Sequence, residues 1–537
     1  MAYYKDLRSF LDVLEESGKL YRFTDPINKD TELLSLCRIQ QRGLPPEQRK
    51  VFLFDNVRNG AGERYDIGVA AGVYGFSDDI VMLGLNKGSH REILELFHDA
   101  LSDPIPPRIV DSGPVQEVVL TGKDITERGL DIIPAPVEEP GFSQIIRAGM
   151  PIISKDPETG ARNAGGYNAF FRDRDRAVSG AGMTRDIMRH WQKARDRGED
   201  LPVAVVIGAT PNIMFAACTH VASDMDEIAF AGALAGEPVE LVPCKTIPVE
   251  VPAHAEMVIE GYLSTKTLEP RLSFGEYPGY MHAERTKVPV LRVTAITHRK
   301  DAMFTPVLVG FPPVESTTLS LVCSQALMYD HLKYKCGLAV YDVGMAPTGG
   351  TSMTVIQIEK DARANPWQVL QAAASFWASG KYFIVVDWDI NPRDSDVLNW
   401  ALSYRVSPER DIQVQRGRYP GLDPSNYPVG SARNMQIQSA PGSPRDYFRV
   451  LIDATMKGVY PPVALPRQEY MERALEIWRS HSDLPEPALK EPWYGYTLGF
   501  WPDEEQRLAD MIANGDYRGV GDITKEMQTS ADGALRH

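Results

Sequence analysis

The stretch IPVEVPAHAEMVIEGYL, residues 247–263, decides the fold class of this chain. Apolar and polar side chains alternate along it, and Pro and Gly interrupt it at short intervals, which is typical of short strands. The neighbouring segments repeat the pattern: VQEVVLTG (115–122), PVAVVIGA (202–209), EPVELVPC (237–244) and PVLRVTAITHR (289–299). We therefore expect a β-rich middle domain, a barrel or a sandwich, with one helix at TRDIMRHWQKARDRG (184–198).

Helical and strand-like segments alternate on both sides of this region. Residues 5–19 carry apolar side chains at helical spacing, whereas KVFLFDNV (50–57) and YDIGVAAGVYG (65–75) have the composition of strands. NKGSHREILELFHDALSDPIPP (86–107) predicts a helix that Ser89 caps and the prolines end. Beyond residue 320 helices and buried strands alternate again, which is typical of an α/β domain.

A length of 537 residues predicts about three domains. The changes of pattern place their boundaries near the proline cluster at 104–107 and near residue 320. We expect an N-terminal α/β domain, a β-rich domain, a C-terminal α/β domain, and an aromatic-rich tail with one amphipathic helix that docks on a neighbouring subunit. These parts are residues 1–112, 113–318, 319–484 and 485–537.

Composition excludes several classes of protein. The net charge is −15, and no lysine run or arginine-rich arm appears, so a nucleic-acid-binding surface is not expected. No apolar run approaches the length of a membrane span, and the N-terminus has no signal-peptide pattern. The five cysteines form no CxxC pair, which favours reduced thiols. We expect a soluble, cytoplasmic enzyme without nucleic-acid or membrane partners.

Three polar constellations lie within the β-rich region, and no GxSxG, Walker or HExxH motif accompanies them. ARNAGGYNAFFRD (161–173) places Asn163 and Asn168 around two glycines, which permit close approach of the backbone to a ligand. In CTHVASDMDEIAFAGALAGEPVELV (218–242) small residues lead to Glu227 at a helix start. In LSFGEYPGYM (272–281) a lone carboxylate, Glu276, lies between glycines and aromatic residues. Each could equally be structural, as a strand turn, a helix cap or a solvated loop.

These stretches, in this order, resemble the UbiD family of reversible decarboxylases. The resemblance is carried by NAGGYN (163–168), DIMRHWQKARDRGEDLPVAVVIGATP (186–211), DEIAFAGALAGEPVELV (226–242), AHAEMVIEGYL (253–263) with FGEYPGY (274–280), IVVDWDINP (384–392) and NWALSYRVSPERD (399–411). It implies a central flavin-reductase-like split β-barrel between two α/β domains, the C-terminal one driving assembly into a homo-oligomer, a dimer or a hexamer. It also implies prenylated FMN, supplied by a flavin prenyltransferase and held through Mn²⁺ (or Mg²⁺) and K⁺.

The resemblance assigns metal and cofactor contacts by position. Asn163 resembles the asparagine ligand and Glu227 the glutamate ligand, and Asp186 stands where the family has a histidine ligand. Three oxygen ligands suit Mn²⁺ or Mg²⁺. His190, one helical turn later, is the alternative ligand, although a structural histidine on an apolar helix face is the simpler interpretation. The resemblance further implies potassium contacts at Ala222 and Ser223 and a cofactor contact at Arg410.

The catalytic group of the family is an arginine and two acids, and here it departs from the pattern. Glu276 matches the second acid, Asn168 stands at the arginine position, and Arg271 stands at that of the first acid. One hypothesis is that Arg271 orients the substrate carboxylate through its planar fork while Asn168 keeps a neutral hydrogen bond toward the flavin. The other is that the site serves a substrate with an additional anionic group or a thioester.

The resemblance implies a reversible, non-oxidative decarboxylase of an aromatic or α,β-unsaturated carboxylic acid. It implies that the acid would form a covalent adduct with the prenylated flavin, that CO₂ would leave, and that Glu276 would act as proton donor. Burial would raise its pKa for that task. Two alternatives remain: a carboxylase or decarboxylase of an activated aromatic compound (a CoA thioester or phenyl phosphate), and a non-catalytic flavin-binding subunit. NMQIQSA (434–440) is a candidate pocket wall by analogy with the family.

Overall fold

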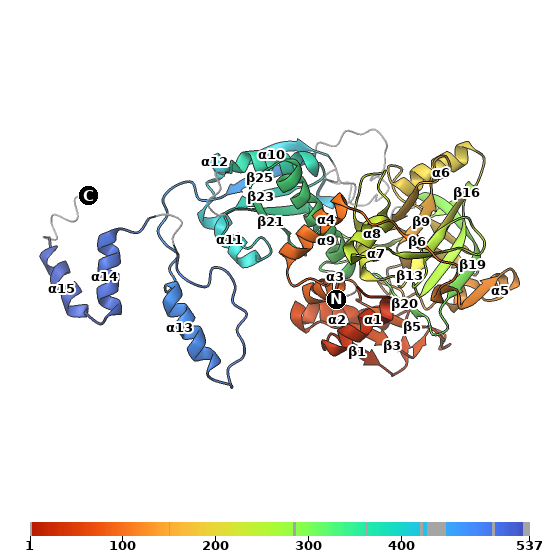
Figure 1. Cartoon of the computed structure of the whole chain (residues 1–537), viewed down its shortest axis with the longest axis horizontal. Helices are drawn as coiled ribbons and strands as arrows, with labels where there is room; N and C mark the ends of the chain where they lie inside the picture. The colour runs from red at the N-terminus through yellow and green to blue at the C-terminus, as the bar shows by residue number, and fades with distance from the viewer. Residues whose placement is uncertain are drawn as a thin grey trace.

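The computed structural model describes residues 3–149, 151–282, 286–359, 364–418, 423–426, 447–496 and 500–529, the side chain of His282 excepted; NMQIQSA lies outside them. Figure 1 shows three regions that follow the chain: N-terminal helices and strands in red, a curled central sheet in yellow and green, and a C-terminal sheet in green and blue. The chain is thus a mixed helix-and-sheet protein with several domains, as expected; the domain boundaries stay a prediction.

The N-terminal region is built on a four-stranded sheet whose order is β1-β3-β5-β20. Its last strand comes from far along the chain, since β20 pairs in parallel with β5 after the chain has passed through the central sheet. The strands are β1 (Leu20–Phe23), β3 (Val51–Phe54), β5 (Gly68–Ala71) and β20 (Met303–Phe304), with a separate pair β2 (Ile27–Asn28) and β4 (Val57–Arg58); the helices are α1 (Leu7–Glu16), α2 (Leu33–Gly43), α3 (Asp78–Leu85) and α4 (His90–Ser102).

Local signals explain the helices of this region. Helix α1 buries Leu7, Phe10, Leu11 and Leu14 on one face, as its periodicity predicts. Ser89 caps α4, accepting a hydrogen bond from Glu92 N at 3.2 Å, and the helix ends two residues before Pro104.

The central sheet curls on itself and supplies most of the functional side chains. Its order is β10-β9-β13-β16-β19-β12-β11-β8, and β7 joins β19. The register of the long antiparallel pair β16–β19 shifts between Glu260 and Gly261. A Cβ on Gly261 would lie 2.2 Å from Arg292 O, so the backbones approach closely there because residue 261 is glycine. Such a bulge bends a strand and helps a sheet to curl. The strands are β7 (Val118–Thr121), β8 (Arg147–Gly149), β9 (Ile152–Lys155), β10 (Arg162–Gly165), β11 (Asn168–Asp173), β12 (Arg176–Ser179), β13 (Leu201–Ile207), β16 (Met257–Pro270) and β19 (Lys287–His298).

Short helices and two small sheets cover this curled sheet. The predicted helix at 184–198 is confirmed as α6, whose apolar face packs against β9, β10, β13 and β16. The helices are α5 (Lys123–Glu127), α6 (Asp186–Asp196), α7 (Pro211–Cys218) and α8 (Glu227–Ala235); the small sheets contain β6 (Arg108–Ile109), β14 (Glu240–Pro243) and β15 (Glu250–Pro252), and β17 (Phe274–Gly275) with β18 (Met281–His282).

The C-terminal region has a five-stranded sheet of order β21-β22-β23-β25-β24. Strands β22, β23 and β25 are parallel, and α10 crosses between the first two, which explains their nearly continuous apolar sequences. The elements are α9 (Glu315–Tyr329), β21 (Val340–Met345), β22 (Met353–Ile358), α10 (Pro366–Phe376), β23 (Tyr382–Val386), α11 (Ser395–Tyr404), α12 (Pro408–Asp411), β24 (Ile412–Gly417) and β25 (Tyr447–Ala454).

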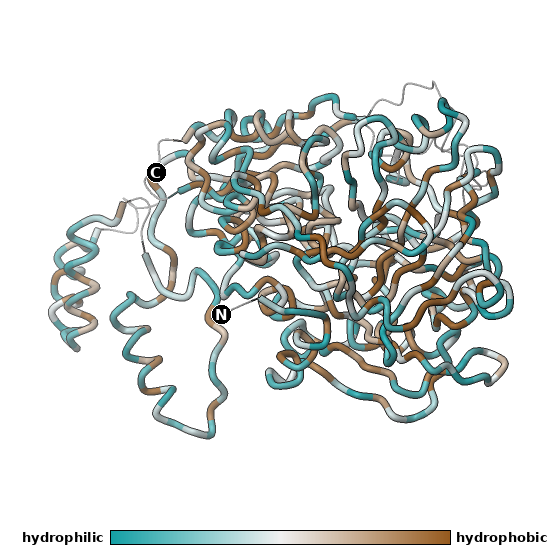
Figure 2. Tube along the Cα trace, turned by 45° about the vertical axis from the view of Figure 1, so that its right-hand side comes forward, coloured by the Kyte–Doolittle hydropathy of each residue, from teal (hydrophilic) through white to brown (hydrophobic). Residues whose placement is uncertain are grey.

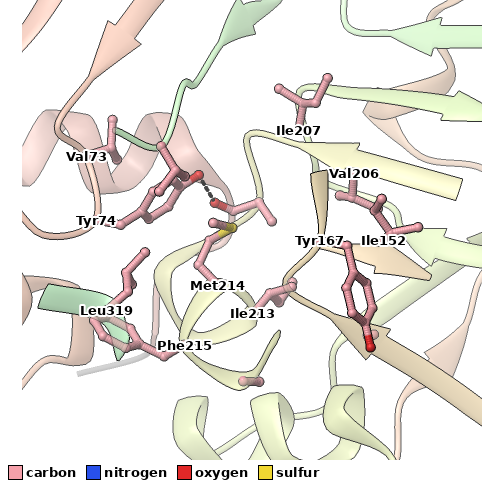
Figure 3. Close-up of a cluster of buried hydrophobic side chains, with 14 of the residues drawn as sticks. Val73, Tyr74, Ile152, Tyr167, Val206, Ile207, Ile213, Met214, Phe215 and Leu319 are labelled. Atoms are coloured by element: carbon pink, nitrogen blue, oxygen red, sulfur yellow. Dashed lines mark hydrogen bonds between the residues drawn. The ribbon is translucent and has the colours of Figure 1, made fainter. Parts of the chain in front are cut away.

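The regions share one continuous hydrophobic core. Figure 3 shows side chains from the N-terminal loop, the curled sheet, α7 and α9 packed together, with Tyr74 Oη donating to Ala209 O at 2.8 Å. In Figure 2 the hydrophobic segments gather inside the body, and polar segments lie at its outside. Because the regions share a core, the relative positions of the site residues are fixed by packing.

The tail contains more helix than expected. Helices α14 (Asp503–Ala513) and α15 (Tyr517–Glu526) lie in it, and α13 (Gln468–Arg479) precedes it. All three stand apart from the body and bury none of their residues (Figure 1). The prediction of one helix beyond residue 484 was wrong, because α15 carries two glycines that lower its helix propensity, yet Asp516 caps it through Gly519 N at 2.8 Å. Docking of this tail on a neighbouring subunit stays a prediction.

No helix among the described residues combines the length and the hydropathy that crossing a membrane requires. All five cysteines are free thiols.

Candidate active site

A cavity of about 440 Å³ is bordered by strands β8, β10 and β11 of the curled sheet, and the three polar constellations of the sequence meet in it. It lies between the β10–β11 turn, the starts of α6 and α8, the end of α7 and the loop that follows β16. Six of the sequence-predicted residues border it: Asn163, Asn168, Asp186, Glu227, Arg271 and Glu276.

The glycines of NAGGYN are explained by close packing. A Cβ on Gly165 would lie 2.4 Å from the ring of Tyr167, which folds back over the turn. Gly166 N donates to Ala217 O at 2.7 Å, so the turn is fastened to the end of α7. Asn163 and Asn168, at either end of the turn, are thereby held at the same cavity.

Glu227 is the buried carboxylate of the site. It begins α8, and its Oε2 accepts a hydrogen bond from Ala164 N at 2.9 Å. Burial raises its pKa to about 7, with the charges of Asp226 and Asp186 adding to the increase and the Ala164 N–H opposing it. A buried carboxylate with acidic neighbours is a favourable place for a cation.

The other oxygen donors lie nearby. Asn163 is 4% exposed, and its buried Nδ2 has no hydrogen-bond partner within the described residues. Since carboxamide N and O are assigned from their partners, this amide can present its oxygen to a ligand. Asp186 begins α6, and its Oδ1 accepts from Arg189 Nη1 at 3.0 Å.

These three residues fit a divalent metal. In the described part of the chain no three His, Cys, Asp or Glu side chains gather as a metal site, so the Asn163 amide is needed as the third donor. An amide and two carboxylates form an all-oxygen set, which suits Mn²⁺ or Mg²⁺.

His190, the alternative ligand, does not border the cavity. It is 7% exposed, and its Nδ1 lies 3.0 Å from Ser154 Oγ inside the sheet. Burial lowers its pKa, so the neutral ring is favoured. The geometry is that of a structural histidine.

Three predicted cofactor contacts lie away from the cavity. Ala222 and Ser223 are exposed on the turn before α8, and the wall is made by residues 217–221 just before them. Arg410 is exposed on α12 and forms a two-pronged pair with Asp411, at 2.8 and 2.9 Å. These three side chains do not border the cavity. The K⁺ contact through the backbone oxygens of Ala222 and Ser223, which follow Val221 of the cavity wall, and the cofactor contact of Arg410 stay predictions.

The segment around Glu276 is bent and fastened. Leu272 has φ +67°, a left-handed conformation that is unfavourable for leucine, so the backbone turns sharply after Arg271. Glu276 N donates to Tyr280 O at 3.0 Å, and Gly279 N donates back to Glu276 O at 2.9 Å. Glu276 is thus held in a closed turn rather than on an open loop.

The electrostatic environment of Glu276 is mixed. Burial raises the pKa of its carboxyl, while the positive charges of Arg271 and Arg147 and the Tyr277 N–H oppose the increase, and Glu138 adds to it. Burial thus shifts this carboxyl toward its protonated form, which suits a group that gives a proton.

Sequence reasoning missed two residues of this site, Glu138 and Arg147. Arg147 borders the cavity from β8 and is 6% exposed; its Nε donates to Glu138 Oε1 at 2.7 Å and its Nη2 donates to Glu138 Oε2. An arginine inside the apolar sequence IIRAGM (145–150) was the available signal, since a buried guanidinium needs a partner.

Asn168 on β11 lies diagonally opposite Arg147 on the neighbouring strand β8. In the β8–β11 pairing it stands opposite Gly149, and a Cβ on that glycine would lie 2.9 Å from Asn168 Oδ1. Arg147 is two residues further along β8, opposite Phe170, and therefore on the same face.

Comparisons with known proteins agree with this architecture. Two family models match, the 3-octaprenyl-4-hydroxybenzoate carboxy-lyase Rift-related domain over residues 108–312 and the carboxy-lyase C-terminal domain over residues 318–444, and together they span more than half of the chain. An uncharacterized protein of Synechocystis sp. is 30% identical over 467 residues, which cover 81% of this chain and 89% of that protein.

Solved structures resemble the whole fold. A vanillic acid decarboxylase of Sedimentibacter hydroxybenzoicus superposes with a TM-score of 0.75 at 25% identity, covering 90% of this chain and 100% of its own. The UbiD-class enzyme HmfF of Pelotomaculum thermopropionicum, in an evolved dimeric form with prFMN, gives 0.73 at 25% identity and covers 87% and 98%. The chain belongs to the UbiD family of carboxy-lyases.

Proposed function

We propose that this protein is a reversible, non-oxidative decarboxylase of an aromatic or α,β-unsaturated carboxylic acid, with Glu276 as the proton donor. The observation that carries the proposal is one cavity bordered by the half-buried Glu276 carboxyl group, by three guanidinium groups, Arg147 and Arg271 among them, and by three oxygen donors for a metal. Each of these groups has a separate task in the removal of CO₂.

The cofactor would be prenylated FMN, which supplies an electron sink for the charge left when CO₂ departs. The HmfF structures with prFMN and with FMN support a flavin here. Asn163, Asp186 and Glu227 would hold a divalent metal, Mn²⁺ or Mg²⁺, against the flavin phosphate, and K⁺ would be a second counter-ion. A flavin prenyltransferase would supply the cofactor.

Arg271 would orient the substrate. Its guanidinium carbon lies 5.0 Å from the centre of the Phe274 ring, at the cavity wall and beside Glu276. A planar fork can bind a carboxylate through two parallel hydrogen bonds, so Arg271 would turn the departing carboxylate toward the reactive centre. Asn168 would give a neutral hydrogen bond toward the flavin.

Glu276 would then complete the reaction. The proton on its carboxyl oxygen passes to the carbon that has lost CO₂, a C–H bond forms, and Glu276 remains as the carboxylate. Burial favours the protonated form that this step needs. In the reverse direction the same carboxylate takes the proton from carbon before CO₂ adds.

The decisive experiment loads the protein with cofactor by co-expression with a flavin prenyltransferase. CO₂ release and deuterium incorporation are then measured over a panel of aromatic and α,β-unsaturated acids. The proposal predicts both for at least one acid, and absence of both across the panel from fully loaded protein contradicts it.

A second candidate has one specific observation in its favour. Asn168 replaces the arginine of the family and Arg271 replaces its first acid. These replacements fit a substrate with a further anionic group, such as a CoA thioester or phenyl phosphate. The same panel, extended to these activated compounds, distinguishes the two. A non-catalytic flavin-binding subunit would bind flavin and turn over neither set.

A further inference from the structure

Arg147 has one guanidinium nitrogen whose hydrogen-bonding capacity is unused. Its Nε and Nη2 both donate to the carboxylate of Glu138, whereas Nη1 is buried and has no hydrogen-bond partner within the described residues. A buried cationic N–H without an acceptor is unfavourable, so an acceptor is expected to reach it in some state of the protein.

Glu138 fixes the direction of this guanidinium. Besides its two contacts with Arg147, its Oε2 accepts from Val309 N at 3.1 Å, which ties the pair to the segment before α9. Both side chains are more than nine-tenths buried. Arg147 is therefore rigid, and Nη1 can turn to no other acceptor without breaking the pair.

Two further acidic side chains interact electrostatically with Arg147, namely Glu139 and Glu276. The Glu139 carboxylate is already engaged by Gly275 N at 3.2 Å and by Arg38 Nη2 at 3.7 Å, so Glu276 is the one placed to reach Nη1. Arg147 and Arg271 both lie over the Phe274 ring, two residues before Glu276, at 5.4 and 5.0 Å from its centre. Arg147 and Glu276 interact electrostatically, and both border the cavity. Arg271 and Arg147 are the two cations that oppose the pKa increase of Glu276, and because Arg271 is assigned to the substrate carboxylate, Arg147 is the one that serves Glu276.

We propose that Glu138 and Arg147 are positioning residues for Glu276, forming an acid–arginine–acid row in which Arg147 Nη1 receives the Glu276 carboxylate once its proton has left. At Asn168, on β11, the chain lacks the arginine of the family. Arg147 on β8, held by Glu138 in the segment before that strand, supplies a cation in its place. This inference rests on the proposed role of Glu276. The proton moves from the Glu276 oxygen to the substrate carbon, and water later returns a proton to Glu276.

Removing a charge from the row should shift the pKa of Glu276, and the direction of the shift depends on which charge is removed. Loss of the Arg147 charge removes a group that favours the Glu276 carboxylate, so Glu276 keeps its proton to higher pH. Loss of the Glu138 charge leaves Arg147 unneutralised, so Glu276 loses its proton at lower pH. Other charged and titratable groups face Glu276 from its own segment, from the loop before β8 and from the far wall: Arg271, Glu139, Arg185, Asp186, His220 and Glu227.

The test follows the protonation of Glu276 by infrared difference spectroscopy on the flavin-loaded protein. The carboxylic acid band that Glu276→Gln abolishes is titrated against pH in the wild type and in three variants. Arg147→Gln should raise the midpoint by about 1–2 pH units, Glu138→Gln should lower it, and Arg147→Lys should stay within a few tenths of the wild type.

Arg147→Gln leaves Glu138 buried without its partner, so the double variant Glu138→Gln/Arg147→Gln serves if the single one fails to fold. Its midpoint should also rise, by less than that of Arg147→Gln. Arg299→Gln is the matched control, because Arg299 is a largely buried arginine, with a side chain 13% exposed, that pairs with Asp6 at 3.0 Å and does not border the cavity.

A midpoint unmoved in folded Arg147→Gln or in the double variant overturns the inference, and so do shifts of the same sign for Arg147→Gln and Glu138→Gln. The readout needs no turnover. If the wild type releases no CO₂ while the midpoints shift as expected, the proposed function fails and the row stands. If CO₂ is released and the midpoints do not move, only the row fails.

Discussion

Glu139 accepts a hydrogen bond from the backbone N–H of Gly275, with 3.2 Å between Oε2 and N, immediately before Glu276. A Cβ on Gly275 would lie 2.2 Å from Glu139 Oε1, so only glycine permits this approach. The Glu139 carboxylate therefore fixes the backbone at Gly275, and through it the position of the Glu276 carboxylate at the cavity wall.

Gly275→Ala is expected to displace Glu276 without unfolding the protein. The added methyl group must push either Glu139 or the segment 274–276 aside, and a shift of about 1 Å at a catalytic group can lower the rate about 100-fold. The measurement is kcat for deuterium exchange into the product of the acid found by the panel. Gly43→Ala, at the end of α2 with no atom within 4 Å of the new Cβ, is the control and should leave kcat unchanged. An unaltered kcat in Gly275→Ala would contradict the dependence.

Glu276→Gln is expected to lower kcat by about 10²–10⁴-fold, since the amide cannot give a proton to carbon. In the wild type, burial raises the pKa of Glu276, and the protonated form is the active one. Activity should therefore fall as pH increases through that pKa. The measurement is a pH profile of decarboxylation. A wild-type rate that increases with pH over this limb would reject Glu276 as the donor.

Arg271→Ala is expected to raise KM and lower kcat/KM by at least about 10-fold, because a charge-assisted hydrogen bond of about 1.5–3 kcal/mol is lost. Arg271→Lys should recover part of this, because the charge remains but the planar fork does not. Asn168→Arg, which restores the family residue, provides the comparison. Full turnover by Arg271→Ala on the true substrate would end the assignment.

The metal site is tested without turnover. Glu227→Gln, Asp186→Asn and Asn163→Ala should each weaken Mn²⁺ binding by more than about 10–100-fold, the loss typical of groups that only support a ligand. Metal retained after dialysis, measured by mass spectrometry, is the readout. His190→Ala is the control, because its ring meets Ser154 and not the cavity, and it should retain the metal. Loss of Mn²⁺ in His190→Ala with retention in Asp186→Asn would reverse the ligand assignment.

Glu315 predicts a pH dependence of stability. It is fully buried at the start of α9, and its oxygens accept from Tyr74 N at 2.7 Å and Leu308 N at 3.2 Å. Burial raises its pKa to about 7, the two N–H groups opposing the increase. The folded state thus binds this proton more tightly than the unfolded state.

The stabilisation from the Glu315 proton is complete below the ordinary glutamate pKa and is lost as pH rises through about 7. It amounts to roughly 3 kcal/mol at most. Glu315→Gln should remove this slope and destabilise the protein by about 1–3 kcal/mol at low pH, because an amide nitrogen cannot accept from a backbone N–H. Urea unfolding between pH 4.5 and 8 measures both, with exposed Glu16→Gln as the control. Parallel pH curves for Glu315→Gln and the wild type would contradict the prediction.

Local patterns were sufficient for much of the fold. Alternating strands in the middle region, the Ser89 cap and the apolar face of α1 depend on neighbours a few residues apart, so a sequence records them directly. Helix α15 was missed because its glycines weaken the local signal and its cap and packing against α14 support it instead.

Only some of the site residues could be predicted from the sequence. Asn163, Glu227 and Glu276 stand out because glycines and small residues around them mark close approach, and they meet in one cavity. The partnership of Glu138 with Arg147 spans a loop, and the proposed one of Arg147 with Glu276 joins β8 to the turn after β17, so no spacing encodes them. The positions of Ala222, Ser223 and Arg410 likewise follow from a turn and a domain arrangement rather than from a motif.

The sequence by itself determined the family, the succession of α/β, β-rich and α/β regions along the chain, and the oxygen-rich character of the site, because these depend on residue type and local periodicity. Only the tertiary structure decided which charges face one another. Arg147 lies at the cavity because β8 pairs with β11 in a curled sheet, and Glu276 faces it because Leu272 bends the chain and Glu139 holds Gly275. Electrostatic coupling depends on distance through space and on burial, and both are set only when the sheet closes.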